Sequence, residues 1–292
     1  MIGEAFVHLG LWLARAIARL PYPVVRRIGD AVGELLWVLA RRRRRITQTN
    51  LRLCFPQWSE AQREAVARRH FRAFARSFFD RFIFWHGPPE RVRALCRIEG
   101  LEHYLPHRGR PVIALAPHFV GLDAAGVRFA LDFGGASVYA KQKSRAMTEA
   151  MIRGRTRFPN TRMFLRTEGL RPVLRAIREG LVLYFLPDMD LGPRDAVFVP
   201  FFGVPAATVT SVGRLAQMTG AAVMPCVTRM DDDGYVMRIH PAWQDFPGED
   251  PVAAARRMNA FIEACVLEMP EQYLWSHRRF KTRPPGEPSV YD

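Results

Sequence analysis

The stretch Ala114-Leu-Ala-Pro-His118-Phe-Val-Gly-Leu-Asp123 is the most informative part of this sequence, because it joins a strand pattern to a histidine and a carboxylate. It has the pattern of a short buried strand, a sharp turn at Pro117, and a histidine followed five positions later by a carboxylate. His118 should therefore lie in the loop at the carboxyl edge of a sheet, where open α/β sheets usually bind ligands. Asp123 should fall in the first turn of the next helix.

A histidine held by a carboxylate is the minimum equipment for removing a proton from a hydroxyl group near neutral pH. If Asp123 holds one ring nitrogen of His118, the other nitrogen is free to act as a base. Five positions on one helix are about 140° apart, so the ring has to swing back from the preceding turn to reach the carboxylate. The alternative, in which Asp123 only stabilises the helix N-terminus, stays open on this motif alone.

From about residue 95, short apolar runs alternate with amphipathic ones. We expect strands at 111–116, 136–140, 181–186, 221–228 and 235–240, and helices near 121–132, 143–155, 169–179, 207–219 and 251–268. Such alternation predicts the α/β class, with a sheet that is covered by helices on both faces. A capping box at Ser59–Gln62 opens a long helix before this region, and Gly87-Pro88-Pro89 ends it.

The first 45 residues differ in character from the rest. Apolar residues recur there at helical spacing, and Pro21 ends the pattern: Phe6, Leu9, Leu13, Ile17 and Leu20. A second apolar run, 31–40, precedes the five arginines Arg41–Arg45. Neither run has the roughly 18 uninterrupted apolar residues of a confident membrane-spanning helix. Because the start also lacks a basic n-region, we expect no cleaved signal peptide.

We interpret residues 1–45 as an anchor that lies on a membrane surface, with the arginine block at cytoplasmic headgroups. The alternative is an ordinary amphipathic helix that packs on the domain. The formal charge of +15 indicates anionic partners, and only three of the 43 basic residues are lysines. We expect no nucleic-acid partner, because no recognisable nucleic-acid-binding motif accompanies the arginines. We expect no metal site, because the four cysteines are far apart and form no Cys/His cluster.

Two further segments suggest chemistry at the edge of the sheet. Three arginines in five residues, Arg153, Arg155 and Arg157, suit phosphate recognition, although a solvated helix end would have the same pattern. The segment from Asp188 to Arg194 follows the strand expected at 181–186 and should reach the same rim as His118. Its acids Asp188 and Asp190 could bind a metal, orient an arginine or cap the turn, and we favour the orientation of an arginine.

Two apolar or basic segments complete the candidate features. Residues 197–205 form an unusually apolar loop that contains Phe201, which suits either a lipid tail or buried packing. Residues 275–284 combine aromatic and basic side chains, which could face headgroups or an acidic partner, or form a structural strap. We assign no catalytic role to His277 in that segment.

Taken together and in this order, these motifs resemble the lipid A biosynthesis lauroyl/myristoyl acyltransferases of Gram-negative bacteria, a branch of the lysophospholipid acyltransferase superfamily. The matching segments span nearly the whole chain: 50–56, 118–123, 154–157, 188–193 with 199–201, and 272–275 with 281–284. Many members of this branch carry Glu where this chain has Asp123, whereas the wider superfamily carries Asp. The resemblance implies a mixed, mostly parallel central sheet of the glycerolipid acyltransferase type, in a single α/β domain over 46–292.

The resemblance also implies an activity. Such enzymes move a fatty acyl group from acyl carrier protein to a hydroxyl of a phosphorylated glucosamine lipid, at the cytoplasmic face of the inner membrane. The acyl carrier protein thioester would be the co-substrate, and no cofactor would be needed. An acidic carrier protein, a phosphorylated lipid and an anionic membrane surface would each suit a chain of charge +15.

The site roles follow from the same resemblance. His118 would be the general base, and Asp123 would orient it and stabilise its charge. Arg155 would bind phosphate or stabilise the developing oxyanion, with support from Asp188 or Asp190. The remaining residues expected to contact substrate are Arg157, Arg194 and Phe201. Two alternatives remain: the same chemistry on a lysophospholipid or an amino-acid lipid, and a non-catalytic basic protein of the membrane periphery.

Overall fold

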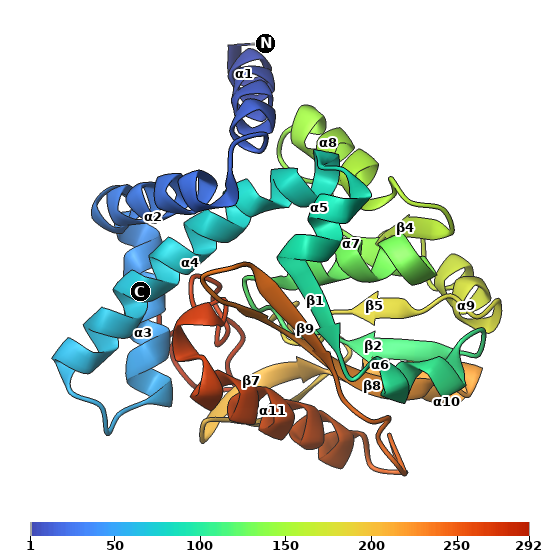
Figure 1. Ribbon diagram of the computed structural model, residues 1–292. Helices are drawn as coiled ribbons and strands as arrows, with labels where there is room; N and C mark the ends of the chain where they lie inside the picture. Colours follow the sequence, from blue (N-terminus) through green and yellow to red (C-terminus); the bar gives the residue numbers. More distant parts are fainter. Residues whose placement is uncertain (1, 292) are drawn as a thin grey trace.

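A seven-stranded mixed sheet organises the computed structural model, which describes residues 2–291 without the side chains of Ile2, Ala5 and Phe6 (Figure 1). The expected contribution of Phe6 to the N-terminal apolar stripe therefore lies outside the described residues. The strand order is β1-β9-β8-β2-β5-β3-β4, and every neighbouring pair is parallel except β8 and β9. These strands are β1 (Cys96–Glu99), β2 (Val112–Leu115), β3 (Gly135–Tyr139), β4 (Thr161–Leu165), β5 (Leu183–Phe185), β8 (Ala222–Met230) and β9 (Tyr235–Ile239).

Helices cover both faces of this sheet, as the alternating pattern predicts. The helices are α1 (Ile2–Ile17), α2 (Tyr22–Leu39), α3 (Arg41–Cys54), α4 (Glu60–His86), α5 (Pro89–Leu95), α6 (Leu101–Tyr104), α7 (Leu122–Phe133), α8 (Arg145–Arg155), α9 (Arg171–Arg178), α10 (Ser211–Thr219) and α11 (Pro251–Glu268), with short 3₁₀ turns at Leu105–His107 and Pro270–Gln272. Strand β2 sends Val112 and Ala114 into the core with α4 and α7, and Ile113 and Leu115 into the core with α9 and α10. The α/β class and the mixed, mostly parallel sheet are confirmed.

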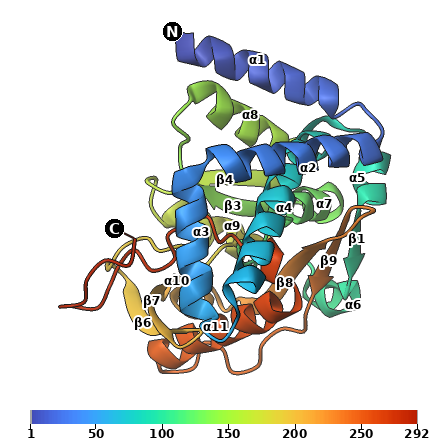
Figure 2. The same ribbon diagram turned by 90° about the vertical axis from the view of Figure 1, so that its left-hand side faces the viewer.

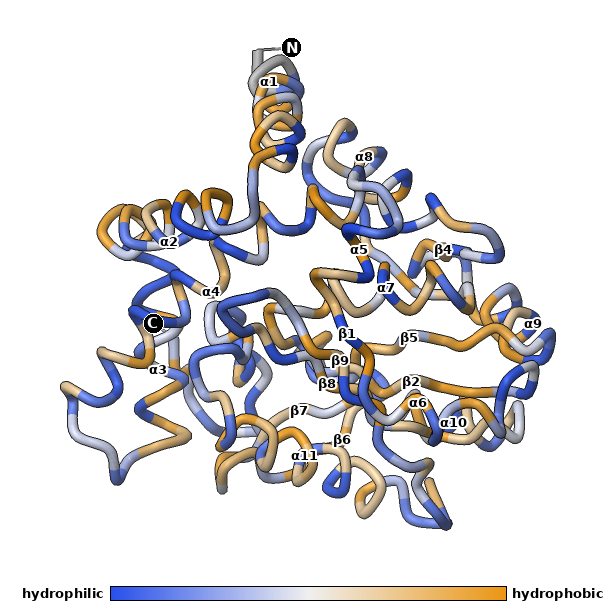
Figure 3. The backbone as a smooth tube through the Cα atoms, in the orientation of Figure 1, coloured by the Kyte–Doolittle hydropathy of each residue, from blue (hydrophilic) through white to orange (hydrophobic). Residues whose placement is uncertain are grey.

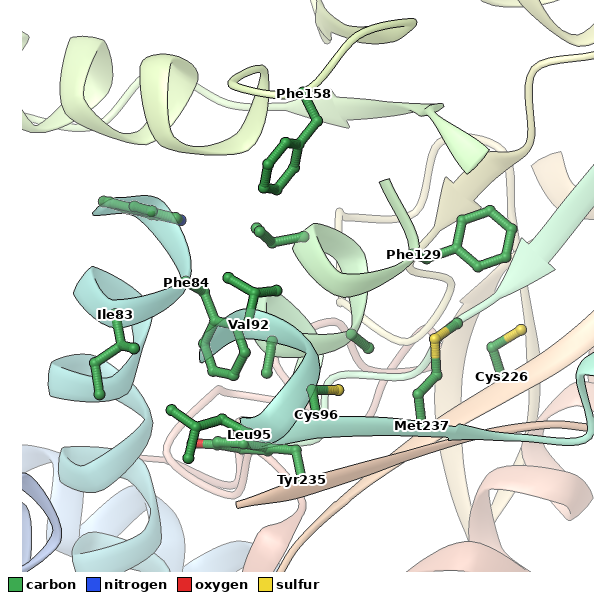
Figure 4. Packing of buried hydrophobic residues seen from close by; sticks show 14 of the residues in the cluster. Ile83, Phe84, Val92, Leu95, Cys96, Phe129, Phe158, Cys226, Tyr235 and Met237 are labelled. Atoms are coloured by element: carbon green, nitrogen blue, oxygen red, sulfur yellow. The ribbon is translucent and has the colours of Figure 1, made fainter. Parts of the chain in front are cut away.

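One core lies between α4, α5, α7 and the β1–β9 side of the sheet (Figure 4). Phe84 of α4 points toward Val92 of α5 and Tyr235 of β9, and the rings of Phe84 and Tyr235 meet edge to face with centroids 5.5 Å apart. The expected capping box begins α4: the Gln62 backbone N–H donates to Ser59 Oγ at 3.2 Å, and the Ser59 N–H donates to Gln62 Oε1 at 2.8 Å. The helix ends at His86, as expected from the following Gly-Pro-Pro.

The apolar segment 197–205 is a β-hairpin and not a loop. Strands β6 (Ala196–Phe201) and β7 (Val204–Val209) pair antiparallel, and Phe202 and Gly203 form the two-residue turn between them. Both turn residues have positive φ, 50° and 77°, which matches the twist of a tight hairpin. The prolines at 200 and 205 obscured this pair, because proline inside an apolar run argues against a strand.

Helix α2 packs closely across α4 (Figure 2). A Cβ atom on Gly33 would lie 2.5 Å from the Cα of Arg72, and one on Gly29 would lie 2.7 Å from the Cα of Arg76. The two helices can approach this closely only because α2 has glycine at both positions. Val25 and Trp37 are buried on the same side of α2. The segment between 22 and 39 thus has one face packed on the domain and one face free.

The exposed sides of α1 and α2 carry many apolar residues, and Figure 3 shows hydrophobic residues along both helices. Trp12 is 64% exposed and Leu39 is 66% exposed, and the other large apolar side chains exposed on or next to these helices are Leu9, Leu13, Leu20, Val24, Leu35 and Val38. Among residues 2–291, no helix is both long enough and apolar enough to cross a bilayer. The five arginines Arg41–Arg45 are helical, because they form the start of α3, which follows α2 after one residue.

The last segment of the chain forms a structural strap rather than a headgroup-facing patch. We call residues 272–283 the C-terminal strap. Its backbone pairs with the loop after β2, where the Leu274 N–H donates to the carbonyl of His118 and the Val120 N–H donates to that of Gln272, both at 2.9 Å. Trp275, Arg279 and Phe280 are almost completely buried. The structural alternative for this segment is therefore the correct one.

Candidate active site

His118 is held by Asp188, and both residues lie where a central strand ends. Asp188 accepts a hydrogen bond from the backbone N–H of His118 at 2.9 Å, and its Oδ1 lies 2.7 Å from Nδ1 of the ring. The two loops meet because β2 and β5 are parallel neighbours, so their carboxyl ends reach the same edge of the sheet. The shared rim expected from the sequence is confirmed.

The contact determines which ring nitrogen of His118 is free. Burial alone would raise the pKa of Asp188, but the charge and hydrogen bonds of His118 outweigh burial, and the pKa lies below its ordinary value. An ionised carboxylate only accepts hydrogen bonds, so Nδ1 carries the proton and Nε2 presents a lone pair. Nε2 makes no hydrogen bond to any residue from 2 to 291, and the side chain is 16% exposed. His118 is thus arranged as a base that can be reached from outside.

The expected pairing of His118 with Asp123 is wrong in this structure. Asp123 lies in the first turn of α7, as predicted, but its carboxylate is held by two arginines from other helices. Arg155 Nε lies 2.7 Å from Oδ1, and Arg81 Nε lies 2.8 Å from Oδ2. The reason is topological: α4 packs on both α7 and α8, so Arg81 of α4 and Arg155 of α8 reach the start of α7, whereas the ring of His118 turns toward the end of β5.

The two arginines change the acidity of Asp123. Burial raises the pKa of this carboxyl, but the charges of Arg155 and Arg81 outweigh burial and lower the pKa to about 2. Asp123 therefore stays ionised at neutral pH. Its role in this geometry is to hold Arg155 beside the rim, which also corrects the expectation that Asp188 or Asp190 supports that arginine.

Arg155 reaches the rim because the residue before it has no side chain. A Cβ atom on Gly154 would lie 2.2 Å from the indole Cγ of Trp85, so only glycine allows α8 to approach α4 this closely. The Nε of Arg155 donates to Asp123, and its two Nη groups make no hydrogen bond to any described residue. The side chain is partly exposed, so these N–H groups can bind an anion.

The other predicted substrate contacts lie in structural positions. Asp190 accepts hydrogen bonds from the N–H and hydroxyl of Thr282, at 2.6 and 2.7 Å, and so fastens the C-terminal strap. Arg157 donates to the carbonyls of Phe84 and Gly87 at the end of α4. Phe201 is completely buried on the hairpin and forms no open wall. Arg194 is exposed in the loop before β6, and its side chain forms no hydrogen bond or ion pair with the residues that the structure describes.

A narrow cavity of about 60 Å³ begins beside Asp123 and Arg155. It runs between α7 and the sheet, and its walls are mainly apolar: Leu122, Phe129, Ala136, Val138, Val182 and Tyr184. A volume of this size holds only a few water molecules, so a long alkyl chain would have to widen the cavity. Across residues 2–291, no group of three or more His, Cys, Asp or Glu side chains is placed to hold a metal ion.

Sequence reasoning missed two residues that organise the rim. Arg81 comes from the second half of α4, and nothing in the sequence spacing links it to Asp123. Asn50 lies in the segment 50–56 and holds the strap by donating to the carbonyls of Trp275 and His277, both at 2.7 Å. A completely buried asparagine in a helix is a signal for such a contact, but the sequence does not show which polar residues are buried.

Comparison with known proteins gives consistent matches. The family model described as bacterial lipid A biosynthesis acyltransferase matches residues 1–282. The chain is 34% identical over 288 residues to the lipid A biosynthesis lauroyltransferase of Escherichia coli, covering 97% of this chain and 94% of that protein. It is 34% identical to the lipid A biosynthesis palmitoleoyltransferase of the same organism, with 97% and 92% covered, and 31% identical to its myristoyltransferase, with 92% and 83% covered.

A solved structure, the 1-acyl-sn-glycerophosphate acyltransferase PlsC from Thermotoga maritima, aligns with 84% of this chain and 98% of that chain. The TM-score is 0.41 and the identity is 14%. At these values the likeness carries no argument.

We expect Asp123→Asn to lower the free energy of unfolding by about 2 kcal/mol or more at pH 7, because the variant loses the buried charge that two partly buried guanidinium groups face. A folded-state pKa near 2, against 3.8 for the free side chain, means that this stabilisation is complete above about pH 4 and is lost as the pH falls toward 2. Urea unfolding of both proteins from pH 7 downward should show the difference shrinking below pH 4.

Asp195→Asn serves as a matched control, since it breaks an ion pair with Arg214 in which both side chains are about half exposed. That variant should change stability by less than about 1 kcal/mol. A difference between wild type and Asp123→Asn that stays constant with pH would contradict the assignment.

Proposed function

The chain belongs to the bacterial lipid A biosynthesis acyltransferase family, and we propose that it transfers a fatty acyl group from a thioester to a hydroxyl of a phosphorylated glucosamine lipid. The observation that carries this proposal is the free Nε2 of His118, fixed by Asp188 at the carboxyl edge of the sheet. The relatives that support it are named for lauroyl, palmitoleoyl and myristoyl transfer in lipid A biosynthesis.

The proposed reaction needs one proton shuttle. Nε2 of His118 removes the proton of the acceptor hydroxyl as its oxygen attacks the thioester carbonyl, which gives a tetrahedral oxyanion. The carbon–sulfur bond then breaks, the carbonyl re-forms, and the thiolate takes the proton from the imidazolium. The products are an ester and a thiol. No electrons are gained or lost overall, so we propose that no cofactor takes part.

Asp188 acts as the positioning residue in this proposal. It fixes the proton on Nδ1 and stabilises the imidazolium that forms when Nε2 is protonated. Asp123 acts one step further away, through Arg155. The free Nη groups of Arg155 suit either the developing oxyanion or a phosphate of the acceptor, and both roles need a guanidinium that is held in place.

We propose acyl carrier protein as the donor's carrier, because an acidic carrier would be drawn to a chain of net charge +15. The exposed part of Arg41–Arg45 and Arg194 are candidate contacts for its acidic surface or for anionic lipid headgroups. The salt dependence of the acyl-transfer rate tests this proposal. The rate with an acyl carrier protein thioester should fall with added salt more steeply than the rate with a coenzyme A thioester.

We further propose that residues 1–45 hold the protein at the cytoplasmic face of the inner membrane. The support is the apolar free face of α1 and α2, which a bilayer interface would cover, next to a helix that begins with five arginines. Peripheral attachment fits these helices, which are amphipathic and packed on one side.

Expression of the chain in a bacterium that lacks its own late lipid A acyltransferases tests the reaction. We expect the lipid A fraction to gain the mass of one fatty acyl chain, and His118→Ala to abolish the gain while the protein still folds and binds membranes. Mass spectrometry of all lipids shows which one changes. A gain on a lysophospholipid or an amino-acid lipid, or turnover that survives His118→Ala, would overturn the proposal.

Asp188→Asn and Asp123→Asn separate the two carboxylates. Because only Asp188 holds the ring, its replacement should lower kcat by about 10²–10⁴-fold and move the acid limb of the pH profile of kcat/KM to lower pH. Asp123→Asn should mainly lower stability and raise KM. If Asp123→Asn removes kcat as fully as His118→Ala while Asp188→Asn remains active, the pairing seen in the structure is not the catalytic one.

Vesicle binding tests the membrane face. Trp12→Glu combined with Leu39→Glu should weaken binding to vesicles of anionic phospholipid by about tenfold or more, because two large apolar side chains no longer enter the interface. Leu267→Glu, at a position 62% exposed on α11, is the matched control and should bind like wild type. Equal binding by the double variant in a sedimentation assay would contradict the proposed anchor.

A further inference from the structure

A second and larger hollow lies on the other side of the His118 loop. We call it the α2–strap groove; it has a volume of about 390 Å³, within the range of small-molecule sites. Its walls come from the end of α2, the start of α3, the middle of α4, the loop after β5 and the strap: Leu36, Ala40, Arg43, His70, Phe71, Phe74, Met189, Leu274, Ser276 and His277. Most of this lining is apolar, although the groove lies beside a polar rim.

The inner end of the groove adjoins the proposed catalytic loop. Met189 lies between Asp188, which holds the His118 ring, and Asp190, which fastens the strap. Leu274 is bonded through its backbone N–H to the carbonyl of His118. A molecule in the groove would therefore lie against the two backbone segments that position the base.

The outer end of the groove adjoins the free apolar face of α2. Leu36 and Ala40 line the groove, and their neighbours Leu35 and Leu39 are more than half exposed. Phe74, whose ring centroid lies 6.2 Å from that of His70, is itself 37% exposed. The apolar surface thus continues from the helix face that we assign to the membrane into the groove, which is the path that a lipid tail would follow.

His70, one of the residues that line the groove, has a buried polar atom without a partner in the part of the chain that the structure describes. His70 is completely buried, and its Nδ1 lies 3.1 Å from the carbonyl oxygen of Glu271. A carbonyl only accepts, so Nδ1 is the protonated nitrogen and Nε2 is an acceptor. Nε2 has no hydrogen-bond partner in the described part of the chain. Burial lowers the pKa of His70 to about 4, so the ring stays neutral and keeps this free acceptor at physiological pH.

The guanidinium of Arg43 lies at the exposed edge of the groove. Arg43 is exposed, donates one hydrogen bond to the carbonyl of Ser276, and forms no ion pair with the residues that the structure describes. Apolar walls, a buried acceptor and an unpaired guanidinium together match an amphiphile: an alkyl tail with a hydroxyl or amide N–H near its polar end, joined to an anionic head.

We propose that the α2–strap groove binds an acyl chain that the acceptor lipid already carries, and so presents the acceptor hydroxyl to His118. This inference rests on the proposed function and adds a binding site to it. The donor's chain is the other possible occupant, but the donor would arrive on a water-soluble carrier, whereas the groove opens toward the helix face proposed to lie on the bilayer. The narrow cavity beside Asp123 and Arg155 is left for the donor's chain.

Leu36→Trp tests this site, because it places a larger side chain in the groove and leaves His118 and Arg155 unchanged. With purified protein in mixed micelles, we expect KM for the acceptor lipid to rise at least tenfold, while KM for the acyl thioester and its chain-length preference change less than twofold. An acceptor analogue that lacks the bound chain should show no difference between the variant and wild type. Leu267→Trp, the same substitution at an exposed site on α11, is the control and should match wild type throughout.

Binding of the acceptor in a His118→Ala background gives a second readout that does not depend on turnover, and His70→Phe should weaken this binding as well. Thermal unfolding identifies a variant that fails to fold, in which case His70→Phe alone decides. Equal acceptor affinity in the groove variants and the control would overturn the groove assignment, and so would a change in donor chain-length preference. If wild type acylates no lipid at all, the proposed function fails instead.

Discussion

The double contact between Asp188 and His118 is the constraint on which the rest of the site depends. One carboxylate binds the backbone N–H and the ring of the same residue, so it fixes both the loop and the tautomer. The contact exists because β2 and β5 are parallel neighbours that end at the same edge. A shift of either strand by one residue would move the carboxylate from the ring, since successive residues point to opposite faces. The two-sided core around β2 prevents such a shift.

The site separates two electrostatic tasks between two carboxylates. Asp188 serves the imidazole, whereas Asp123 serves a pair of guanidinium groups. Each acid is buried, and each is kept ionised by a partner that differs in kind. A proton can therefore move at His118 while the charge around Arg155 stays constant. Two separate hollows lie near these carboxylates: the narrow cavity beside Asp123 and Arg155, and the α2–strap groove beside the loop of Asp188.

Much of the fold could be predicted from the sequence, because apolar periodicity reports burial directly. Strands β2, β3, β5, β8 and β9 lie where expected, and the capping box and the glycine-proline stop bound α4. The hairpin of β6 and β7 was not predicted, because prolines inside an apolar run are typical of a loop. The carboxylate that contacts His118 was also not predicted. Asp123 is near His118 in the sequence, whereas Asp188 is 70 residues away and is brought near only by the order of the strands. Spacing predicted which residues reach the rim, but not which of them touch.

The C-terminal strap has a consequence for the order in which the protein matures. Its backbone completes the loop that carries the base, and Asn50 and Asp190 fasten it only after residues 272–283 have been synthesised. The apolar helices at the N-terminus leave the ribosome first, long before this closing segment. Under the proposed function, a nascent chain therefore reaches the membrane surface before the loop of His118 is complete. A translation product that stops before residue 272 would then occupy that surface without turning over.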